Sequence, residues 1–384
     1  MLAFRRALLS AIALVALVLS PFAAAEFAPT GDMSLGQGGR YGAFAARLPN
    51  GKVLYAGGFN GANLATGQVY DPATATFAST TNGLSVARGF GRTVTLQDGR
   101  ILLIGGGNYD ESGAVVNADL YDPATGLFTP TGSMHTARAA FMAVRLQNGK
   151  VLVAGGANGV TRLTDAEIYD PATGAFTVTG SLLVSRNNGV AAVLPNGKVL
   201  ITGGGRGDGV SRSEAELYDS ASGTFSVTGS MNEGRDDATA TLLPNGKVLV
   251  AGGANFDLPL STAELYDPAT GTFTMSASTM PPRDFASAVL LPNNLVLIAG
   301  GQGDTHGLGD TGALDDGVIY DYQTDSFTTA GRMATARYYT PVILLDDGRV
   351  LIAGGYNNDG VVSASEIYSY SFVDEIFVDG FDGP

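Results

Sequence analysis

The sequence contains no cysteine and no tryptophan among its 384 residues. Without cysteine the chain can form no disulfide bond, thiolate metal site or cysteine nucleophile, so its stability must come from an apolar core. Charged residues are scarce at 15%, whereas glycine occurs 54 times and hydrophobic residues make up 45% of the chain. This composition favours short strands and tight turns over amphipathic helices.

Basic residues are fewer than acidic residues. Lys and Arg number 22 against 36 Asp and Glu, which gives a formal net charge of -14. An acidic chain repels the phosphate groups of nucleic acids and the headgroups of anionic lipids. We therefore expect neither a nucleic-acid partner nor insertion into a membrane, and cationic or neutral ligands fit this charge better.

Residues 1–25 have the pattern of a secretory signal peptide. Arg5 and Arg6 precede an almost wholly apolar run, residues 7–22, and residues 23–25 are all alanine. The apolar run is too short, and wrongly flanked, for a membrane span. We expect cleavage before Glu26 and a mature protein that is secreted or periplasmic.

The strongest signal in the sequence is a repeat of 48 to 54 residues, marked by a doubled glycine. The doubled glycines begin at Gly57, Gly105, Gly155, Gly203, Gly252, Gly300 and Gly354. Each unit also holds a turn dipeptide between two apolar runs, such as Asn245-Gly246, which favours a β-hairpin. Further along, an Asp-Pro-Ala-Thr-Gly type turn lies between Tyr266 and Phe273 and indicates two more strands. Four strands at this spacing are typical of a propeller blade.

These units resemble the kelch repeat throughout, although kelch repeats usually carry Trp at the position where this chain has Phe. The resemblance implies an all-β fold, namely a seven-bladed kelch-type β-propeller over residues 26–370. Each blade is expected to be a four-stranded antiparallel sheet.

The ends of the repeat predict how the ring closes. After Tyr368 no Asp-Pro turn follows, so the seventh blade lacks a fourth strand of its own. At the other end, residues 27–33 match residues 128–134, which form a fourth strand and its exit loop. We expect the N-terminal strand to complete blade seven and remove a free sheet edge. Residues 371–384 form a short acidic and aromatic tail, which either packs on blade seven or serves sorting or partner recognition.

Comparison of the blades with one another separates scaffold from candidate site. An arginine recurs in every blade near the start of the first strand: Arg40, Arg88, Arg138, Arg186, Arg235, Arg283 and Arg337. An acid stands two residues before the Tyr of the third strand in five blades: Asp119, Glu167, Glu216, Glu264 and Glu366. Gln68 and Val318 replace it in blades one and six. Our interpretation is that these residues form ion pairs that hold the blades together.

The alternative is functional. Guanidinium groups facing the channel would bind an anionic ligand at its mouth, with Arg88, Arg283 and Arg337 as candidate contacts. Polar and aromatic residues of the loops between second and third strands would form the rest of the rim, since a rigid scaffold presents its ligand through such loops. These candidate ligand contacts are Asn60, Asn108, Tyr109, His306 and Tyr356.

The loop of blade six, residues 302–317, is the longest and most acidic of these loops. Its carboxylates Asp304, Asp310 and Asp315 are candidate ligands for Ca²⁺, which prefers oxygen donors. Their spacing fits no EF-hand, and Asp with Gly is also typical of a solvated turn. Apart from Ca²⁺ we expect no cofactor.

Two functions from different classes remain open. The first is a non-enzymatic binding module for a carbohydrate or protein ligand, acting as a monomer at the loop face around the channel. The second, implied by resemblance to kelch-type sugar epimerases, is a carbohydrate-acting enzyme such as a sugar-acid epimerase or lyase. Galactose oxidase is a kelch relative whose copper site needs a cysteine crosslinked to a tyrosine. Because this chain has no cysteine, that copper chemistry is excluded.

Overall fold

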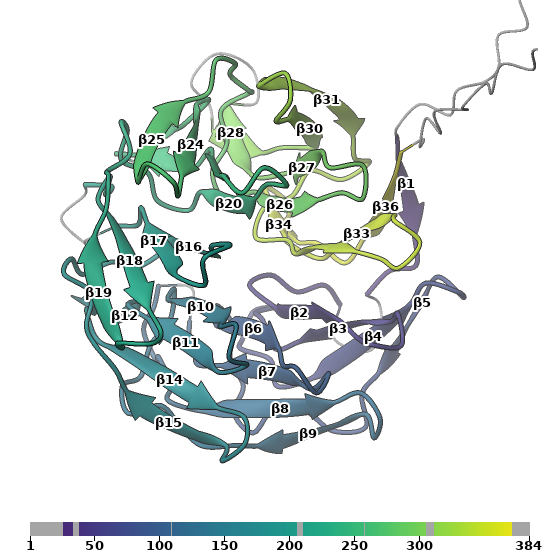
Figure 1. Cartoon of the computed structure of the whole chain (residues 1–384). Helices are drawn as coiled ribbons and strands as arrows, with labels where there is room; N and C mark the ends of the chain where they lie inside the picture. Colours follow the sequence, from purple (N-terminus) through teal and green to yellow (C-terminus); the bar gives the residue numbers. More distant parts are fainter. Residues whose placement is uncertain are drawn as a thin grey trace, which may run out of the picture.

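The computed structural model describes residues 26–33, 38–108, 110–205, 210–256, 258–304 and 311–370. These residues form seven four-stranded antiparallel sheets, arranged as blades around a common centre (Figure 1). The predicted all-β, seven-bladed propeller is confirmed. In the described part of the chain no helix is long and apolar enough to cross a membrane.

The first strands of the blades neighbour one another around the centre, and they are β2 (Phe44–Arg47), β6 (Arg92–Thr95), β10 (Met142–Arg145), β16 (Val190–Val193), β20 (Thr239–Leu242), β26 (Ser287–Leu290) and β32 (Val342–Leu344). The second strands are β3 (Val53–Ala56), β7 (Ile101–Ile104), β11 (Val151–Ala154), β17 (Val199–Thr202), β21 (Val248–Ala251), β27 (Val296–Ala299) and β33 (Val350–Ala353). All four residues of every second strand are buried, because each lies between two strands of its own blade and two neighbouring blades.

The third strands are β4 (Gly67–Asp71), β8 (Ala118–Asp122), β14 (Ala166–Asp170), β18 (Ala215–Asp219), β24 (Ala263–Asp267), β30 (Asp316–Asp321) and β36 (Ser365–Ser369). The outermost strands are β5 (Thr76–Ser79), β9 (Leu127–Pro130), β15 (Ala175–Val178), β19 (Thr224–Val227), β25 (Thr272–Met275), β31 (Ser326–Arg332) and, for blade seven, β1 (Glu26–Thr30). Short hairpins extend four of the loops between second and third strands: β12 (Ala157–Asn158) with β13 (Thr161–Arg162), β22 (Ala254–Asn255) with β23 (Leu258–Pro259), β28 (Gln302–Asp304) with β29 (Thr311–Ala313), and β34 (Tyr356–Asn357) with β35 (Gly360–Val361).

The core lies between the blades. Each hydrophobic cluster joins residues of two neighbouring blades, as where Val94 and Leu102 of blade two pack with Val153 and Tyr169 of blade three. The Tyr of each third strand packs on the Phe of its outer strand, with ring centroids 4.8 to 5.0 Å apart. Phe serves here at the position where kelch repeats usually have Trp.

Ring closure follows the prediction. Strand β1 pairs antiparallel with β36, so that Phe27 lies opposite Tyr368 and completes the fourth-strand pattern of blade seven. Beyond the strand, Met33 is fully buried, and its N–H donates to the carbonyl of Ser363 at 2.9 Å. The first residues of the described chain therefore join its two ends, which lie together in Figure 1.

The doubled glycines link each blade to the next. The N–H of the second glycine donates to the carbonyl of the following blade's arginine, as from Gly253 to Arg283 at 2.9 Å, and Gly355 closes the ring onto Arg40. A glycine is required because Gly253 has a φ of 85° and an added Cβ would lie 2.4 Å from the carbonyl oxygen of Asp236. The same step recurs between all seven neighbouring blades.

The recurring arginines are buried scaffold residues, lying shortly before the first strand of each blade and not within it. In blade five, Arg235 donates to the carbonyls of Gly252 and Thr262, and its guanidinium pairs with Glu264 at 3.2 Å. Glu264 in turn accepts the backbone N–H groups of Asn232 and Glu233. The predicted ion pairs are present in blades two to five and in blade seven. They lie within a blade and not between blades, because each fastens the loop entering a blade to the third strand of that same blade.

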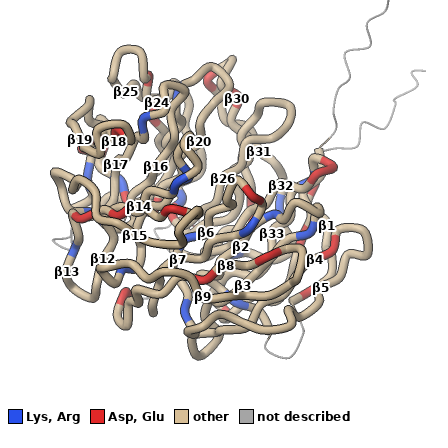
Figure 2. Tube along the Cα trace, turned by 60° about the horizontal axis from the view of Figure 1, so that its bottom comes forward, with Lys and Arg blue, Asp and Glu red and all other residues tan. Residues whose placement is uncertain are grey.

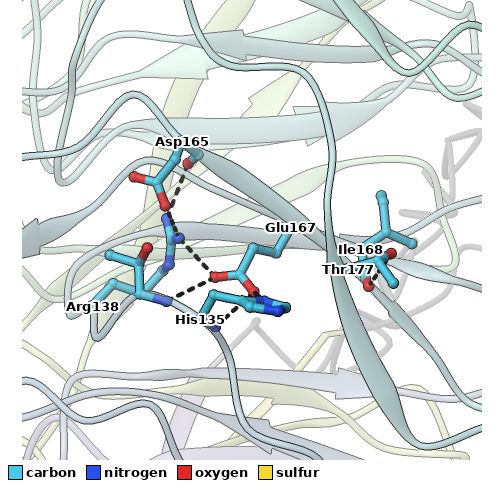
Figure 3. Close-up of polar contacts among 7 residues, drawn as sticks. His135, Arg138, Asp165, Glu167, Ile168 and Thr177 are labelled. Carbon is cyan, nitrogen blue, oxygen red and sulfur yellow. Dashed lines mark hydrogen bonds and ion pairs between the residues drawn. The ribbon is translucent and has the colours of Figure 1, made fainter.

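Figure 3 shows the same arrangement in blade three, where Arg138 contacts both Asp165 and Glu167. Glu167 also accepts hydrogen bonds from the backbone of Thr136 and from the ring and backbone of His135. Burial raises the pKa of the Glu167 carboxyl, but the hydrogen bonds and the nearby guanidinium outweigh burial and hold that pKa below its usual range. His135 thus belongs to the scaffold.

Blades one and six depart from this pattern. In blade six, where Val318 replaces the acid, Asp316 pairs with Arg283 at 3.0 Å. In blade one, where Gln68 replaces it, Arg40 donates to the carbonyls of Gly57 and Thr66, and no described carboxylate contacts it. Burial lowers the pKa of Arg40 to about 10.

A chain that begins at Asp32 should be much less stable than one that begins at Glu26. Without β1, the edge of β36 is open and the ring contact of Phe27 is lost. We expect a loss of about 3 kcal/mol or more, accompanied by aggregation. Equal thermal midpoints for the two chains would contradict closure by β1.

The substitution Glu264→Ala should cost about 3–5 kcal/mol, because it leaves the charge of Arg235 buried without its partner. The matched control is Asp267→Ala, since that carboxylate pairs with Lys247 on the surface and should cost about 1 kcal/mol or less. Urea unfolding measures both. Removing Arg235 and Glu264 together should cost less than the sum of the single losses, and an additive result would argue against a coupled pair.

Candidate functional site

In each blade, the two residues that directly follow the scaffold arginine form part of the mouth of the central channel. The first makes an isolated antiparallel bridge to the residue that follows the doubled glycine, as between Tyr338 and Tyr356. This bridge occurs in every blade. The position is therefore held by backbone contacts, whichever side chain it carries.

The second residue after the arginine has left-handed backbone in every blade, with φ between 49° and 60° at Gly42, Phe90, Ala140, Asn188, Asp237, Phe285 and Tyr339. Its N–H donates to the carbonyl of the equivalent residue in the preceding blade, as from Asn188 to Ala140 at 2.8 Å. Six such bonds run from Gly42 round to Tyr339, and we call this series of contacts around the channel the backbone ring. Because non-glycine residues rarely adopt this conformation, the ring packing must impose it.

A cavity of about 400 Å³ lies inside this ring. Residues from all seven blades line it, many of them small, such as Ala43, Ala143 and Ala191. A volume of this size suits a small-molecule ligand. The cavity is thus placed where the sequence analysis expected a ligand, at the channel mouth.

One side of the mouth is aromatic. We name this cluster the aromatic wall; its members are Tyr41, Phe59, Phe90, Phe285, Tyr338, Tyr339 and Tyr356, from blades six, seven, one and two. Their ring centroids lie 4.4 to 6.4 Å apart, so the rings pack on one another and leave no gap for a ligand group between them. All seven are half-buried. Phe90, Phe285 and Tyr339 line the cavity itself.

Away from the aromatic wall the cavity is polar, with Asn188 of blade four and Asp237 of blade five at the mouth. A cation also lines the cavity: Arg92 lies on the first strand of blade two, the blade that carries Phe90. Arg92 occupies the first position of β6, where other blades have residues such as Phe44, Met142 or Ser287. The fold does not require a cation there. Arg92 and Asp237 are both half-buried.

Neither charge is neutralised by a close partner in the described part of the chain. Arg92 donates to the carbonyl of Gly91 at 3.1 Å, and burial lowers its pKa while the charge of Asp237 raises it. The pKa of Asp237 is raised well above its usual range, first by desolvation and then by the carboxylates of Asp236 and Asp284. Titratable groups perturbed in this way inside a cavity are typical of ligand or active sites.

Glu111 spans the rim next to the polar side. It reaches from the loop of blade two to Asn187 of blade four, with an Nδ2 to Oε1 distance of 2.5 Å, and it pairs with Arg162 of blade three at 3.0 Å. It crosses the mouth at blade three, where Ala139 and Ala140 carry no larger side chain. Burial raises the pKa of the Glu111 carboxyl. The basic and acidic residues along the chain are marked in Figure 2.

The arginines named as candidate ligand contacts lie elsewhere. Arg88, Arg283 and Arg337 are 0% exposed, and each guanidinium already pairs with a carboxylate of its own blade. The alternative of a guanidinium ring facing a ligand is therefore wrong for these residues. Their charges are needed within the blades, because an unpaired buried charge would be costly.

The candidate rim residues divide between the mouth and the outer loops. Tyr356 belongs to the aromatic wall, as expected for a residue at the mouth. Asn60 and Asn108 lie in the loops of blades one and two and do not line the cavity. Asn108 accepts a hydrogen bond from the side-chain amide of Asn63 and donates one to the hydroxyl of Ser112. Tyr109 lies outside the described residues.

The acidic loop of blade six does not bring its described carboxylates together. Asp304 pairs across the hairpin with Thr311, whereas Asp315 lies further along and binds Arg332 at 3.1 Å. Asp310 and His306 lie outside the described residues. Among the residues that the structure describes, no group of three carboxylates or histidines could hold a metal ion, so Ca²⁺ binding by this loop stays a prediction.

The comparisons with known proteins agree with the architecture. The family model described as the Kelch motif matches residues 138–183 and 239–280. The chain thus contains kelch motifs within its seven-bladed β-propeller. A solved structure described as a novel fungal alcohol oxidase with catalytic diversity among the AA5 family, in complex with copper, is 19% identical with a TM-score of 0.72. The alignment covers 90% of this chain and 76% of that one. No curated protein matches the chain.

At this identity the likeness to the oxidase shows the fold alone. The residues of this propeller do not fit a copper site of the galactose oxidase type. Cysteine is absent from the sequence, and His135 is bound to Glu167 and does not line the cavity.

The sequence analysis missed Arg92 and Asp237, the two charged residues of the cavity. A signal for Asp237 is present in the repeat. Aligned on the scaffold arginine, the second residue after it is Gly, Phe, Ala, Asn, Asp, Phe and Tyr in blade order. A position that is structurally equivalent in all blades but varies so widely in chemistry is where a kelch propeller can carry specificity.

The substitution Asp237→Asn should raise the thermal midpoint at pH 8 and leave it nearly unchanged near pH 4. A raised pKa means that the folded state favours the protonated carboxyl, so stability is lost as the pH rises through that pKa. Asparagine removes this loss. The control Asp110→Asn should show the opposite sign, because hydrogen bonds from Ser112 lower the pKa of that exposed carboxyl. A variant less stable than the wild type at pH 8 would contradict the assignment.

Proposed function

We propose that this kelch propeller is an exported binding module that holds a carbohydrate in the cavity at its channel mouth. The proposal is supported by one observation above all: the cavity has an aromatic wall on one side and polar side chains on the other. Kelch propellers in general act as binding and interaction modules. A rigid ring fits this role, since it presents the contacts without a large ordering cost.

A sugar matches both sides of the cavity. Its ring has an apolar face of C–H groups that can pack on Phe90, Phe285 or Tyr339, while its hydroxyls can exchange hydrogen bonds with Asn188, Asp237 and Arg92. The cavity volume of about 400 Å³ is adequate for one or two sugar rings. A protein ligand is the alternative occupant of the same face.

Thermal unfolding of residues 26–384 with a panel of neutral sugars, amino sugars and sugar acids tests the proposal. A ligand that binds only the folded state adds about 2.7 kcal/mol of stability at a hundredfold excess over its dissociation constant. We expect at least one sugar to raise the midpoint. If no sugar does so, the carbohydrate proposal fails and a protein ligand is favoured.

The variants Phe90→Ala and Tyr339→Ala should weaken the sugar that binds by about fivefold or more, because each removes an aromatic face from the cavity. Both should fold, since Ala140 occupies the equivalent left-handed position in blade three. The matched control is Phe256→Ala, where the Phe also has a left-handed φ of 52° but is 61% exposed in a hairpin away from the cavity. An equal effect of the control would place the ligand elsewhere.

One observation favours the enzyme as a second candidate. Arg92 could hold the carboxylate of a sugar acid while Asp237, with its raised pKa, exchanges a proton with the neighbouring carbon, as an epimerase or lyase requires. Incubation of sugar acids with the protein in ²H₂O, followed by NMR, distinguishes the two functions. Deuterium uptake or elimination that is lost in Asp237→Asn, with binding retained, would establish catalysis.

A further inference from the structure

One basic and one acidic side chain line the cavity on opposite sides of the ring. Arg92 belongs to blade two and Asp237 to blade five, and both line the same space. They form no ion pair with each other, although each acts on the other's charge. In the described part of the chain, neither group is therefore paired with an opposite charge by direct contact.

Arg92 differs from the scaffold arginines in this respect. Arg235, for example, uses its guanidinium on two carbonyls and a carboxylate. Arg92 makes one hydrogen bond, to the adjacent carbonyl of Gly91, and the remaining donors of its guanidinium have no described partner. An anionic group of a ligand in the cavity would supply hydrogen-bond acceptors for these guanidinium donors.

Asp237 is in the converse situation. Its carboxyl makes no hydrogen bond to any described residue, and the carboxylates of Asp236, Asp284 and Glu111 act on it from three other positions around the mouth. Desolvation is the main cause of the raised pKa of Asp237, and the three carboxylates raise it further. The negative potential of these three carboxylates favours a positive charge beside Asp237. A bound ammonium group would be favoured in the same way and would let the carboxyl ionise.

We propose that the ligand of this cavity is dipolar, a small molecule with an ammonium group placed at Asp237 and a carboxylate placed at Arg92, such as an amino sugar acid. The aromatic wall between blades six and two would pack on the apolar face of the ligand. This inference rests on the proposed function for the place of the ligand, and it narrows the class from carbohydrates in general to those that carry both charges.

Four sugars that share the glucosamine ring test the proposal; in the two muramic acids a lactyl ether supplies the carboxylate. Muramic acid carries an ammonium and a carboxylate, N-acetylmuramic acid the carboxylate alone, glucosamine the ammonium alone, and N-acetylglucosamine neither. Titration calorimetry on residues 26–384 at pH 6.5 should give an affinity for muramic acid about tenfold or more above that for each of the other three.

Two variants assign the charges. Arg92→Gln should remove the advantage of muramic acid over glucosamine, and Asp237→Asn should remove its advantage over N-acetylmuramic acid. The matched controls Arg145→Gln and Asp359→Asn alter exposed charges that do not line the cavity, and they should leave all affinity ratios unchanged.

The outcomes separate this inference from the function on which it rests. If N-acetylglucosamine binds as tightly as muramic acid, the dipolar ligand is wrong while carbohydrate binding stands. If a sugar with only one of the two charges binds as tightly as muramic acid, the cavity does not recognise the missing charge, and the inference is likewise wrong. If none of the four sugars binds, the inference and the carbohydrate proposal both fail.

Discussion

The buried arginine that opens each blade is the interaction on which the rest of this propeller depends. Its carbonyl accepts an N–H from the second glycine of the preceding blade, and its guanidinium holds the strands of its own blade. In six of the seven blades a carboxylate compensates its charge. Because a buried charge is costly unless it is paired and hydrogen-bonded, the geometry of this contact leaves little freedom to the loop that carries it.

That rigidity creates the candidate site. The two residues after each arginine are held by a bridge and by the backbone ring around the channel, so their positions do not depend on their side chains. The chain can place Phe, Ala, Asn, Asp or Tyr there without altering the scaffold. These side chains are distributed unevenly around the mouth, with aromatic residues on one side and polar residues on the other. An asymmetric ligand site thus arises within a nearly symmetric ring.

Ring closure explains how such a scaffold can do without disulfides. Seven sheets bury their second strands completely between neighbours, and this requires every blade to have a neighbour on both sides. Strand β1 supplies the last outer strand, and Gly355 bonds to Arg40 across the junction. The stability of each blade therefore depends on closure of the whole ring.

The fold could be read from the sequence alone, because its determinants are local and repeated. Each repeated feature specifies a backbone conformation or a core position within one unit: the doubled glycines, the Asn-Gly turns, and the Tyr and Phe of the third and fourth strands. Closure is predicted because the unit that ends near Tyr368 lacks a fourth strand, whereas the segment around Phe27 has the sequence of one. The arginine and acid pairs were predicted for the same reason. Which charges face the channel was decided by the tertiary structure: Arg88 is buried against its own blade, whereas Arg92 and Asp237, 145 residues apart, line one cavity. No pattern within a single repeat contains that information, because a site at the centre of a ring is assembled from all of its blades.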